Sequence, residues 1–314
     1  MADVTQSTQH WAKAGEHSFI FGMRVLYAVH HLLGRRVFRA LAFPWVLGHW
    51  LLRPQLRATS TQYLQRLQKS TGALRRPVRW YDSLRHTALF ADTMLDKLLA
   101  AAGQYPRALI RFTAIGQELQ HAAASGQGGL IVTAHMGCVE LCRGLPDVHR
   151  KMRLNVLVHT RHAQHFNDLL QRLNPSNPVR LIEVNEIGPH TAMILNERIA
   201  AGEFVAIAAD RIPVQGSKTV QVHFLGEDAP FPVGPWVLAS LLKCPVWFLA
   251  CVHEGVGYHV HVEKISEQIV LPRATRQLAL HEQASRYAKW LEHLLIQSPY
   301  DWFNFFPFWE QPRQ

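Results

Sequence analysis

The stretch GGLIVTAHMGCVE, residues 128–140, decides how this chain is expected to fold. A short apolar run, typical of a buried strand, leads to His135, and Glu140 follows five residues later as the chain enters a helical pattern. The carboxyl ends of strands in an α/β fold expose side chains for chemistry. An imidazole can accept a proton near neutral pH, and a carboxylate can fix its tautomer. The two residues therefore predict a general base and its orienting partner.

The spacing of these two residues limits how they can meet. On one continuous helix, five residues turn about 500°, which leaves the side chains about 140° apart. They can meet only if His135 lies in the turn before a helix and Glu140 lies in its first turns. Gly137 makes such a turn possible because glycine accepts unusual backbone angles. The alternative interpretation is that His135 caps a helix and that Glu140 is solvated.

Strands and helices alternate along most of the chain. Residues 54–72 predict a linking helix, residues 84–103 an amphipathic helix, and residues 107–124 another helix. Further strands are expected at residues 154–159, 179–184, 204–209, 220–224, 246–252 and 258–265. Further helices are expected at residues 139–145, 163–173, 191–201 and 235–243. This alternation predicts an α/β fold with a mixed, largely parallel sheet covered by helices.

Charge separates the first quarter of the chain from the rest. The 314 residues include 33 Lys and Arg and 23 Asp and Glu, a formal net charge of +10. Residues 1–80 hold 12 of the basic residues and only two acidic ones, so the whole excess belongs to this part. An anionic partner is expected there, and the apolar surroundings of the arginines favour an anionic membrane surface over nucleic acid. We therefore predict an N-terminal, basic and apolar helical membrane-associating segment over residues 1–72 and a catalytic domain over residues 73–314.

The predicted membrane segment contains two apolar runs, residues 19–36 and 37–53, the second broken by Pro44. Neither reaches 18 uncharged apolar residues, so a clean transmembrane span is not expected. On helical spacing, a narrow basic stripe is formed by Arg24, His31 and Arg35. We interpret the runs as an anchor that lies on the membrane, with Trp45 and Trp50 at the interface. A pair of buried core helices whose arginines reach solvent is the alternative.

Several other classes of function lack their sequence signals. The four cysteines form no CxxC pair, which indicates a reducing compartment and no disulfide framework. Cys138 and Cys142 could join His135 around a metal, but no second His/Cys cluster has ligand spacing, so neither a metal nor a cofactor is expected. No G-x-S-x-G motif supports an α/β hydrolase. The glycines at 126–129 precede a strand, which disfavours a dinucleotide site.

His-x4-Glu after an apolar strand resembles the first motif of the lysophospholipid acyltransferase superfamily. Glutamate in place of the more usual aspartate resembles its lipid A biosynthesis (late) acyltransferase branch, and residues 75–310 are similar to that branch. The resemblance implies that His135 deprotonates an acceptor hydroxyl, which attacks the thioester of a fatty acyl carrier. It favours acyl carrier protein over acyl-coenzyme A as the donor. The chain lacks a Glu-Gly-Thr-Arg third motif, which argues against a glycerolipid acceptor.

The same resemblance implies three substrate-binding residues. Arg161, after the strand at 154–159, and Asn167, on the next helix, match positions of the branch, and a guanidinium suits an anionic group. Asp210 matches an acidic residue that is typically followed by Gln, where this chain has Arg211. An Arg161–Asp210 ion pair, or simple surface charges, are the alternatives. The aromatic residues 302–309 resemble the Trp-rich tail of the branch, which could plug the core or form one wall of an acyl channel.

These features predict a membrane-associated O-acyltransferase with a lipid or glycolipid acceptor, at the cytoplasmic face of the bacterial inner membrane. The alternatives are a non-enzymatic membrane-binding module and an acyl hydrolase or thioesterase. Binding of nucleic acid is not expected.

Overall fold

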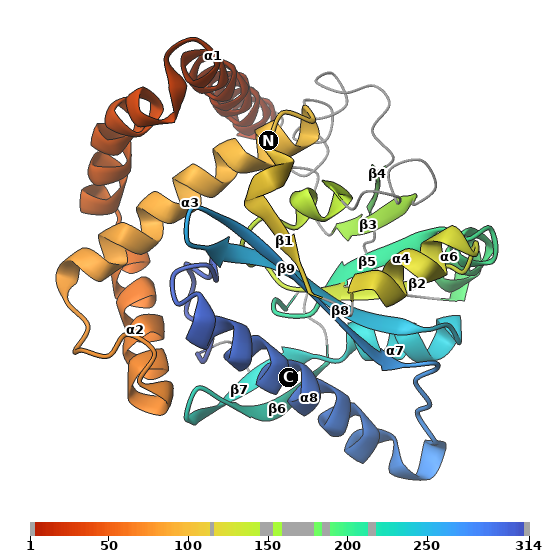
Figure 1. Ribbon diagram of the computed structural model, residues 1–314. Helices are drawn as coiled ribbons and strands as arrows, with labels where there is room; N and C mark the ends of the chain where they lie inside the picture. Colours follow the sequence, from red (N-terminus) through yellow and green to blue (C-terminus); the bar gives the residue numbers. More distant parts are fainter. Residues whose placement is uncertain are drawn as a thin grey trace.

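The computed structural model describes residues 4–113, 116–144, 153–158, 179–183, 189–212 and 218–310. Its centre is a seven-stranded sheet with the strand order β1-β9-β8-β2-β5-β3-β4 (Figure 1). The strands are β1 (Ile110–Phe112), β2 (Gly129–Thr133), β3 (Leu154–Val158), β4 (Val179–Glu183), β5 (Phe204–Ala208), β8 (Val246–Glu254) and β9 (Gly257–Ser266). In this described sheet only β8 and β9 pair antiparallel. The predicted mixed, largely parallel sheet is therefore confirmed.

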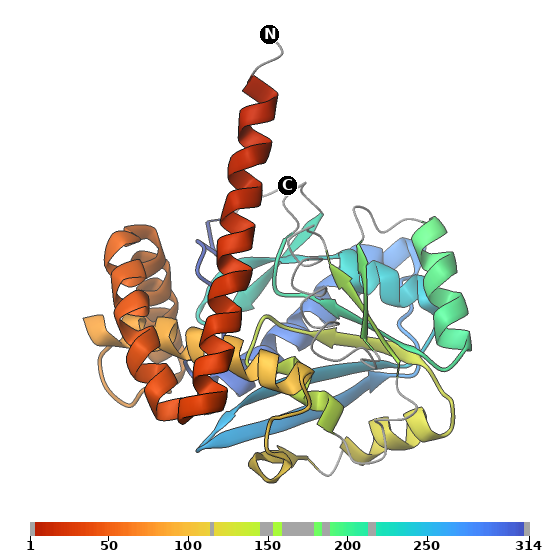
Figure 2. The ribbon, with the colours of Figure 1, turned by 90° about the horizontal axis from the view of Figure 1, so that it is seen from above.

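Helices cover both faces of the sheet (Figures 1 and 2). One face packs against α1 (Val4–Leu52), α3 (Trp80–Ala101) and α4 (Gly116–Ala124). The other packs against α2 (Pro54–Thr71), α6 (Pro189–Ala200), α7 (Gly234–Leu242), α8 (Arg276–Gln297) and the antiparallel hairpin of β6 (Thr219–Phe224) and β7 (Glu227–Pro232). Short 3-10 helices are η1 (Arg107–Leu109), η2 (Val139–Gly144) and η3 (Arg273–Thr275).

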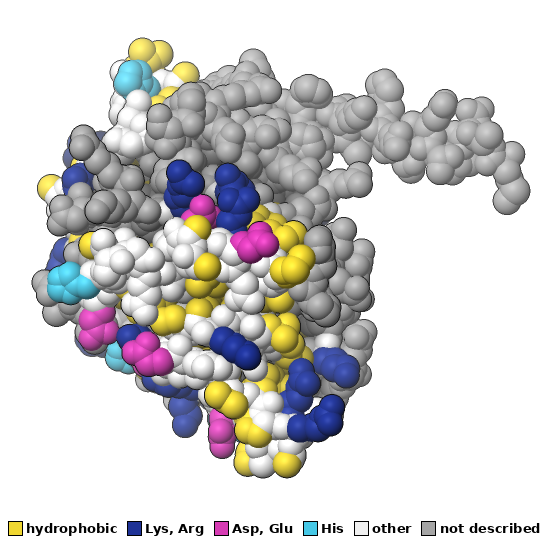
Figure 3. Space-filling model, turned by 90° about the vertical axis from the view of Figure 1, so that its right-hand side faces the viewer, with side chains coloured by type: hydrophobic (Ala, Val, Ile, Leu, Met, Phe, Trp, Pro, Cys, Tyr) yellow, Lys and Arg dark blue, Asp and Glu magenta, His cyan; other side chains and the backbone are white. Residues whose placement is uncertain are grey.

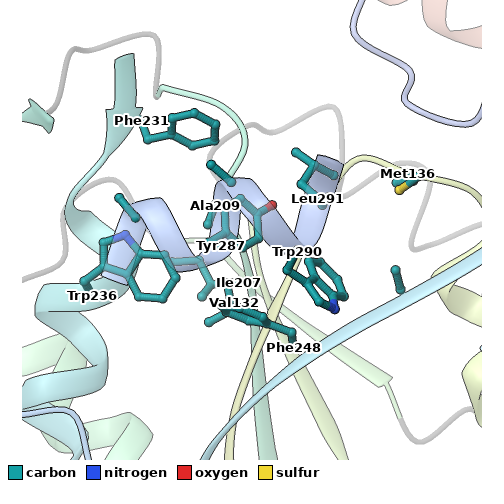
Figure 4. Packing of buried hydrophobic residues seen from close by; sticks show 14 of the residues in the cluster. Val132, Met136, Ile207, Ala209, Phe231, Trp236, Phe248, Tyr287, Trp290 and Leu291 are labelled. Carbon is teal, nitrogen blue, oxygen red and sulfur yellow. The ribbon is translucent and has the colours of Figure 1, made fainter. Parts of the chain in front are cut away.

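The core lies in two layers because side chains alternate along each strand. Val132, Ile207 and Phe248 come from β2, β5 and β8 and belong to the layer under α7 and α8 (Figure 4). Tyr287 on α8 packs edge-on against Phe248, with ring centroids 5.4 Å apart. Ile131 and Trp247, one residue away on their strands, belong to the opposite layer under α3 and α4. The central strands are apolar on both faces because both faces are covered.

Two predictions about the helices were wrong. Residues 107–124 form η1, β1 and then α4, because Ile110 and Phe112 pair with β9 at the edge of the sheet. Pro44 does not break the second apolar run, since it lies inside α1. The chain bends at Gly34 instead, where φ is 79° and only glycine is unstrained. The α8 helix has no counterpart among the predicted elements.

The N-terminal segment combines buried and exposed apolar side chains. The first half of α1 projects away from the sheet (Figure 2), whereas Phe38 and Ala42 in the second half are buried in the layer that also contains α3. Trp45 is 83% exposed, but Trp50, predicted at the interface, is buried and donates a hydrogen bond to Ser83. No helix among the described residues is long and apolar enough to cross a membrane.

Candidate active site

The site begins where β2 and β5, neighbours in the sheet, both end. Thr133 of β2 pairs in register with Ala208 of β5. His135 and Asp210 each lie two residues beyond these partners, so the parallel pairing brings them to the same edge. The carboxyl ends of these two parallel strands thus bring a histidine and a carboxylate together, at the edge where α/β folds commonly carry their functional residues.

Asp210 holds His135 at two points. Its Oδ1 lies 2.8 Å from Nδ1 of the imidazole, and its Oδ2 accepts the backbone N–H of His135 at 2.8 Å. The indole Nε1–H of Trp302 donates to the same Oδ2 at 2.9 Å. The carboxylate is fully buried, whereas the side chain of His135 is 40% exposed. The sequence predicted Asp210 as a substrate contact, and the structure places it against the imidazole.

The charge of Asp210 determines which nitrogen of the His135 imidazole carries the proton. Burial raises the pKa of Asp210, but the charge and hydrogen bond of His135, with Arg211 and Trp302, outweigh it and lower the pKa to about 2. The carboxylate is thus ionised at neutral pH and accepts a hydrogen bond from the Nδ1–H group of His135. Nε2 then carries a free lone pair when the ring is neutral. A histidine in this state can take a proton from a hydroxyl group.

The loop that carries His135 is tied to a distant part of the chain. The backbone N–H of Phe303 donates to the carbonyl of His135 at 3.0 Å, and the N–H of Gly137 donates to the carbonyl of Asp301 at 3.0 Å. Met136 and Trp302 form an antiparallel bridge between these two bonds. On the other side, the N–H of Cys138 donates to the carbonyl of Cys251 on β8 at 2.8 Å. The loop is therefore fixed between β8 and residues 301–303.

Glu140 has a different neighbour from the one predicted. The sequence placed its carboxylate on the imidazole of His135, but the position at Nδ1 belongs to Asp210. Both oxygens of Glu140 lie 2.9 Å from Nζ of Lys97 on α3. The reason is local: Gly137 and Cys138 bond to residues 301 and 251, and the chain then turns into η2, which packs against α3. Burial lowers the pKa of Lys97, and the charge of Glu140 more than offsets it, so the pKa is raised.

The other predicted residues have mixed outcomes. Arg161 and Asn167 lie outside the described residues. Arg211, which stands where the resembling branch typically has Gln, donates from Nη2 to the carbonyl of Phe303 at 2.8 Å. Its guanidinium lies 5.6 Å from the ring centroid of Phe306. Burial lowers the pKa of Arg211, and the charge of Asp210 opposes that effect. Arg211 therefore anchors the aromatic tail.

A second Asp–His pair, Asp301 and His253, makes the same two contacts as Asp210 and His135. Asp301 accepts the backbone N–H of His253 at 2.5 Å and faces its Nδ1 at 2.6 Å. On the other side, Nε2 of His253 lies 4.0 Å from the carboxylate of Asp96 on α3. That buried carboxylate also accepts hydrogen bonds from Arg35 of α1 at 2.6 Å and from the hydroxyl of Tyr258 at 2.8 Å. Arg35, predicted to face lipid headgroups, thus points into the protein.

Sequence reasoning missed three of these residues. Lys97 stands 43 positions before Glu140, and no local pattern connects them. Trp302 was noted only as part of an aromatic tail, and Asp301 beside it was not singled out. Within the described ranges, no group of three or more His, Cys, Asp or Glu side chains could hold a metal ion.

Comparison with known proteins places this site in a family. No curated protein matches the chain. The family model described as bacterial lipid A biosynthesis acyltransferase matches residues 90–311, which include β1 to β9, α8 and both residues of the His135–Asp210 pair. The match covers well over half of the chain. The chain belongs to the bacterial lipid A biosynthesis acyltransferase family.

Proposed function

We propose that this protein is a membrane-associated O-acyltransferase that moves a fatty acyl chain from an acyl thioester to a hydroxyl group of a lipid or glycolipid. Family membership supports an acyltransferase that acts on lipid. The observation that carries the proposal further is the His135–Asp210 pair, in which a buried ionised carboxylate holds Nδ1 of a partly exposed imidazole. The donor proposed is acyl carrier protein, with acyl-coenzyme A as the alternative.

The chemistry needs no covalent enzyme intermediate. Nε2 of His135 takes the proton of the acceptor hydroxyl as its oxygen attacks the thioester carbonyl. The tetrahedral oxyanion collapses, the C–S bond breaks, and the thiolate leaves with the proton that the imidazolium returns. Asp210 keeps Nδ1 protonated and stabilises the imidazolium, which is the role expected of the carboxylate beside such a base.

Three further residues complete the proposed site. Glu140, held by Lys97, fixes the chain that follows the His135 loop. Arg161 and Asn167 are proposed to bind an anionic group of the donor or acceptor, because a guanidinium matches carboxylate and phosphate groups.

A transfer assay tests the function. Purified protein in detergent is incubated with acyl carrier protein carrying a radiolabelled acyl chain and with a total bacterial membrane lipid extract. We expect a labelled lipid with the wild type and a loss of about a thousandfold in His135→Ala, because the base is removed. His223→Ala is the matched control, since the side chain of His223 on β6 is 72% exposed and faces Asp228 at 3.4 Å. Equal rates in the two variants would remove His135 from the chemistry, and label released only as free fatty acid would indicate a thioesterase.

We also propose that the protein binds the cytoplasmic surface of the bacterial inner membrane through the surface formed where α1 ends and where α2 and α3 begin. Trp45, Leu52 and Trp80 are 83%, 81% and 67% exposed there, and Arg53 and Arg79 are exposed beside them. Apolar side chains bordered by arginines suit an anionic bilayer surface. The face shown in Figure 3 instead scatters hydrophobic side chains among charges of both signs.

Vesicle flotation tests this surface. We expect wild-type protein to float with vesicles that contain phosphatidylglycerol, and Trp45→Ser with Leu52→Ser to lower the bound fraction about tenfold. Val256→Ser is the control, because Val256 is 88% exposed in the β8–β9 turn, which belongs to none of these three helices. Unchanged binding of the double variant would contradict the assignment of this surface.

A further inference from the structure

We propose that Trp302 is a positioning residue for the acid–base pair, acting on His135 through Asp210. The inference rests on the proposed function and names a residue that sets its efficiency. Trp302 is proposed to contact Asp210 and not the substrate. Its indole N–H fixes the carboxylate that in turn fixes the imidazole.

The carboxylate of Asp210 has three described donors in a fixed arrangement. Oδ1 faces Nδ1 of His135, and Oδ2 receives both the backbone N–H of His135 and the indole N–H of Trp302. Two donors on Oδ2 hold the carboxyl plane so that Oδ1 points at the imidazole. A carboxylate with a single side-chain partner could rotate about its Cβ–Cγ bond, and the ring would lose its orientation.

The indole contact is not a by-product of burying a large ring. Trp236 and Trp247 are as buried as Trp302, yet their indole N–H groups have no partner among the described protein atoms. Trp302 alone of these three is aimed at a carboxylate. A hydrogen bond to an ionised group is stronger than one between neutral groups.

Trp302 is itself held rigidly, as a positioning residue has to be. Its ring packs edge-on against Tyr63 at 5.1 Å and Phe308 at 5.1 Å between centroids. Its carbonyl lies 2.9 Å from Nε2 of the buried His86 on α3. The antiparallel bridge to Met136 fixes its backbone beside the His135 loop. Sheet, helix and tail therefore all restrain the indole that contacts Asp210.

The effect of the indole N–H is geometric. It helps to keep Oδ1 of Asp210 directed at Nδ1 of His135, where the two atoms lie 2.8 Å apart. Without the indole donor, the carboxylate can rotate and the hydrogen bond that orients the imidazole is loosened. The charged and titratable groups that face Asp210 are His135 itself, Arg211 after β5 and Tyr287 on α8, and none of them is altered by a change at position 302.

Trp302→Phe is the test, with Trp309→Phe as its matched control. Trp309 belongs to the same tail and packs on Phe224, but its indole N–H faces a backbone carbonyl at 3.4 Å. We expect kcat of acyl transfer to fall about tenfold in Trp302→Phe with KM within twofold, and to stay within twofold in Trp309→Phe. In the Asp210→Asn background, Trp302→Phe is expected to add less than twofold, because the partner of the indole is then uncharged.

Two further measurements separate positioning from packing and from the proposed reaction. 3-Benzothienylalanine at position 302 keeps the shape of tryptophan without the N–H donor, and we expect it to reproduce the loss seen in Trp302→Phe. NMR of protein labelled with ¹⁵N-histidine follows the proton on Nδ1 of His135. We expect this proton to exchange with water faster in both variants and at the wild-type rate in Trp309→Phe, because only removal of the indole donor loosens the hydrogen bond to Asp210.

The outcomes are distinct. If wild-type protein transfers no acyl chain, the proposed function fails, and the exchange of the Nδ1 proton still decides the role of Trp302. If the benzothienyl protein matches the wild type in rate and in proton exchange, or if Trp302→Phe and Trp309→Phe behave alike, Trp302 acts by packing alone and the inference is overturned.

Discussion

At the scale of single residues, Gly137 shows how closely the His135 loop is fitted. Its φ is +52°, and a Cβ atom there would lie 1.9 Å from the carbonyl oxygen of Cys251. That oxygen accepts the N–H of Cys138, so it cannot move without opening the loop. Glycine is needed here both for its backbone angles and for the space it leaves.

Gly137→Ala is therefore expected to lower the free energy of unfolding by roughly 3 kcal/mol or more, since backbone strain and a steric clash add together. Gly255→Ala provides the comparison: its φ is +59°, and nothing lies within 4 Å of the added Cβ. That variant should lose only about 1 kcal/mol, from strain alone. Urea unfolding of both proteins gives the two values, and equal losses would show that the contact with Cys251 yields easily.

Buried titratable groups make the stability of the fold depend on pH. His86 lies between the hydroxyl of Ser60 and the carbonyl of Trp302. Burial lowers its pKa to about 4, and the bond to Trp302 offsets only part of that effect. The unfolded chain binds this proton below about pH 6.5 and the folded chain does so only near pH 4, so stability falls as the pH drops through that window.

The contribution of His86 to this loss is about 3 kcal/mol across the window. We expect His86→Gln to flatten the decrease in the urea midpoint between pH 7 and pH 4.5, because glutamine keeps polar contacts without titrating. His223→Gln should leave the decrease unchanged, because the side chain of His223 is exposed. A second decrease, below about pH 4, is expected as Asp210 and Asp82 gain protons, since each has its pKa lowered to about 2.

Part of the site could be predicted from single residues. The run at 129–133 followed by His135 and the run at 204–208 followed by Asp210 predicted two strand ends with polar side chains. That they lie side by side depends on the pairing of β2 with β5, and no local pattern encodes strand order. Glu140 was the nearest carboxylate in the sequence, whereas the carboxylate that contacts the imidazole is 75 residues away.

At the scale of elements, α3 contributes charged side chains to the protein interior as well as the apolar stripe from which the helix was predicted. The leucines of this helix, among them Leu95 and Leu99, pack on the sheet as expected. The same helix also brings Asp96 and Lys97 to the protein interior, where they meet Arg35 and Glu140. Helical periodicity predicts which face is buried, but it cannot predict which distant charges that face will meet.

The Arg35–Asp96 contact joins α1 to α3 and leads to a test of this helix pair. Asp96 is fully buried, and its Oδ1 has no partner among the described protein atoms, so Arg35 is needed to balance its charge. Arg35→Met should lower stability by about 3 kcal/mol, because it leaves a buried charge unpaired. Adding Asp96→Asn should restore much of the loss.

Arg39→Met serves as the control for this pair in thermal or urea unfolding. Arg39 contacts Asp92 at 2.8 Å on the same two helices, but its side chain is mostly exposed. Its removal should cost less than about 1 kcal/mol. If Asp96→Asn fails to rescue Arg35→Met, the loss comes from packing and not from charge.

At the scale of the whole molecule, the alternation of strands and helices predicted the class of fold but not all of its parts. Residues 107–124 look helical throughout, and only pairing with β9 makes Ile110–Phe112 a strand. The α8 helix was missed although Tyr287 and Leu291 on it complete the core under the sheet. The aromatic run at residues 302–309 predicted either a plug of the core or one wall of an acyl channel. Trp302 in this run is fully buried, and the hydrogen bonds that Trp302 and Phe303 make to the residues after two strand ends follow only from the assembled fold.

The strand order also affects the chain while it is being synthesised. β2 lies between β5 and β8, and the ribosome makes everything from β3 to α7 before it makes β8. At about 5–20 residues per second, one edge of this apolar strand stays unpaired for roughly ten seconds. An open apolar strand edge can pair with another nascent chain. This protein is therefore expected to depend on chaperones that shield β2 until β8 emerges.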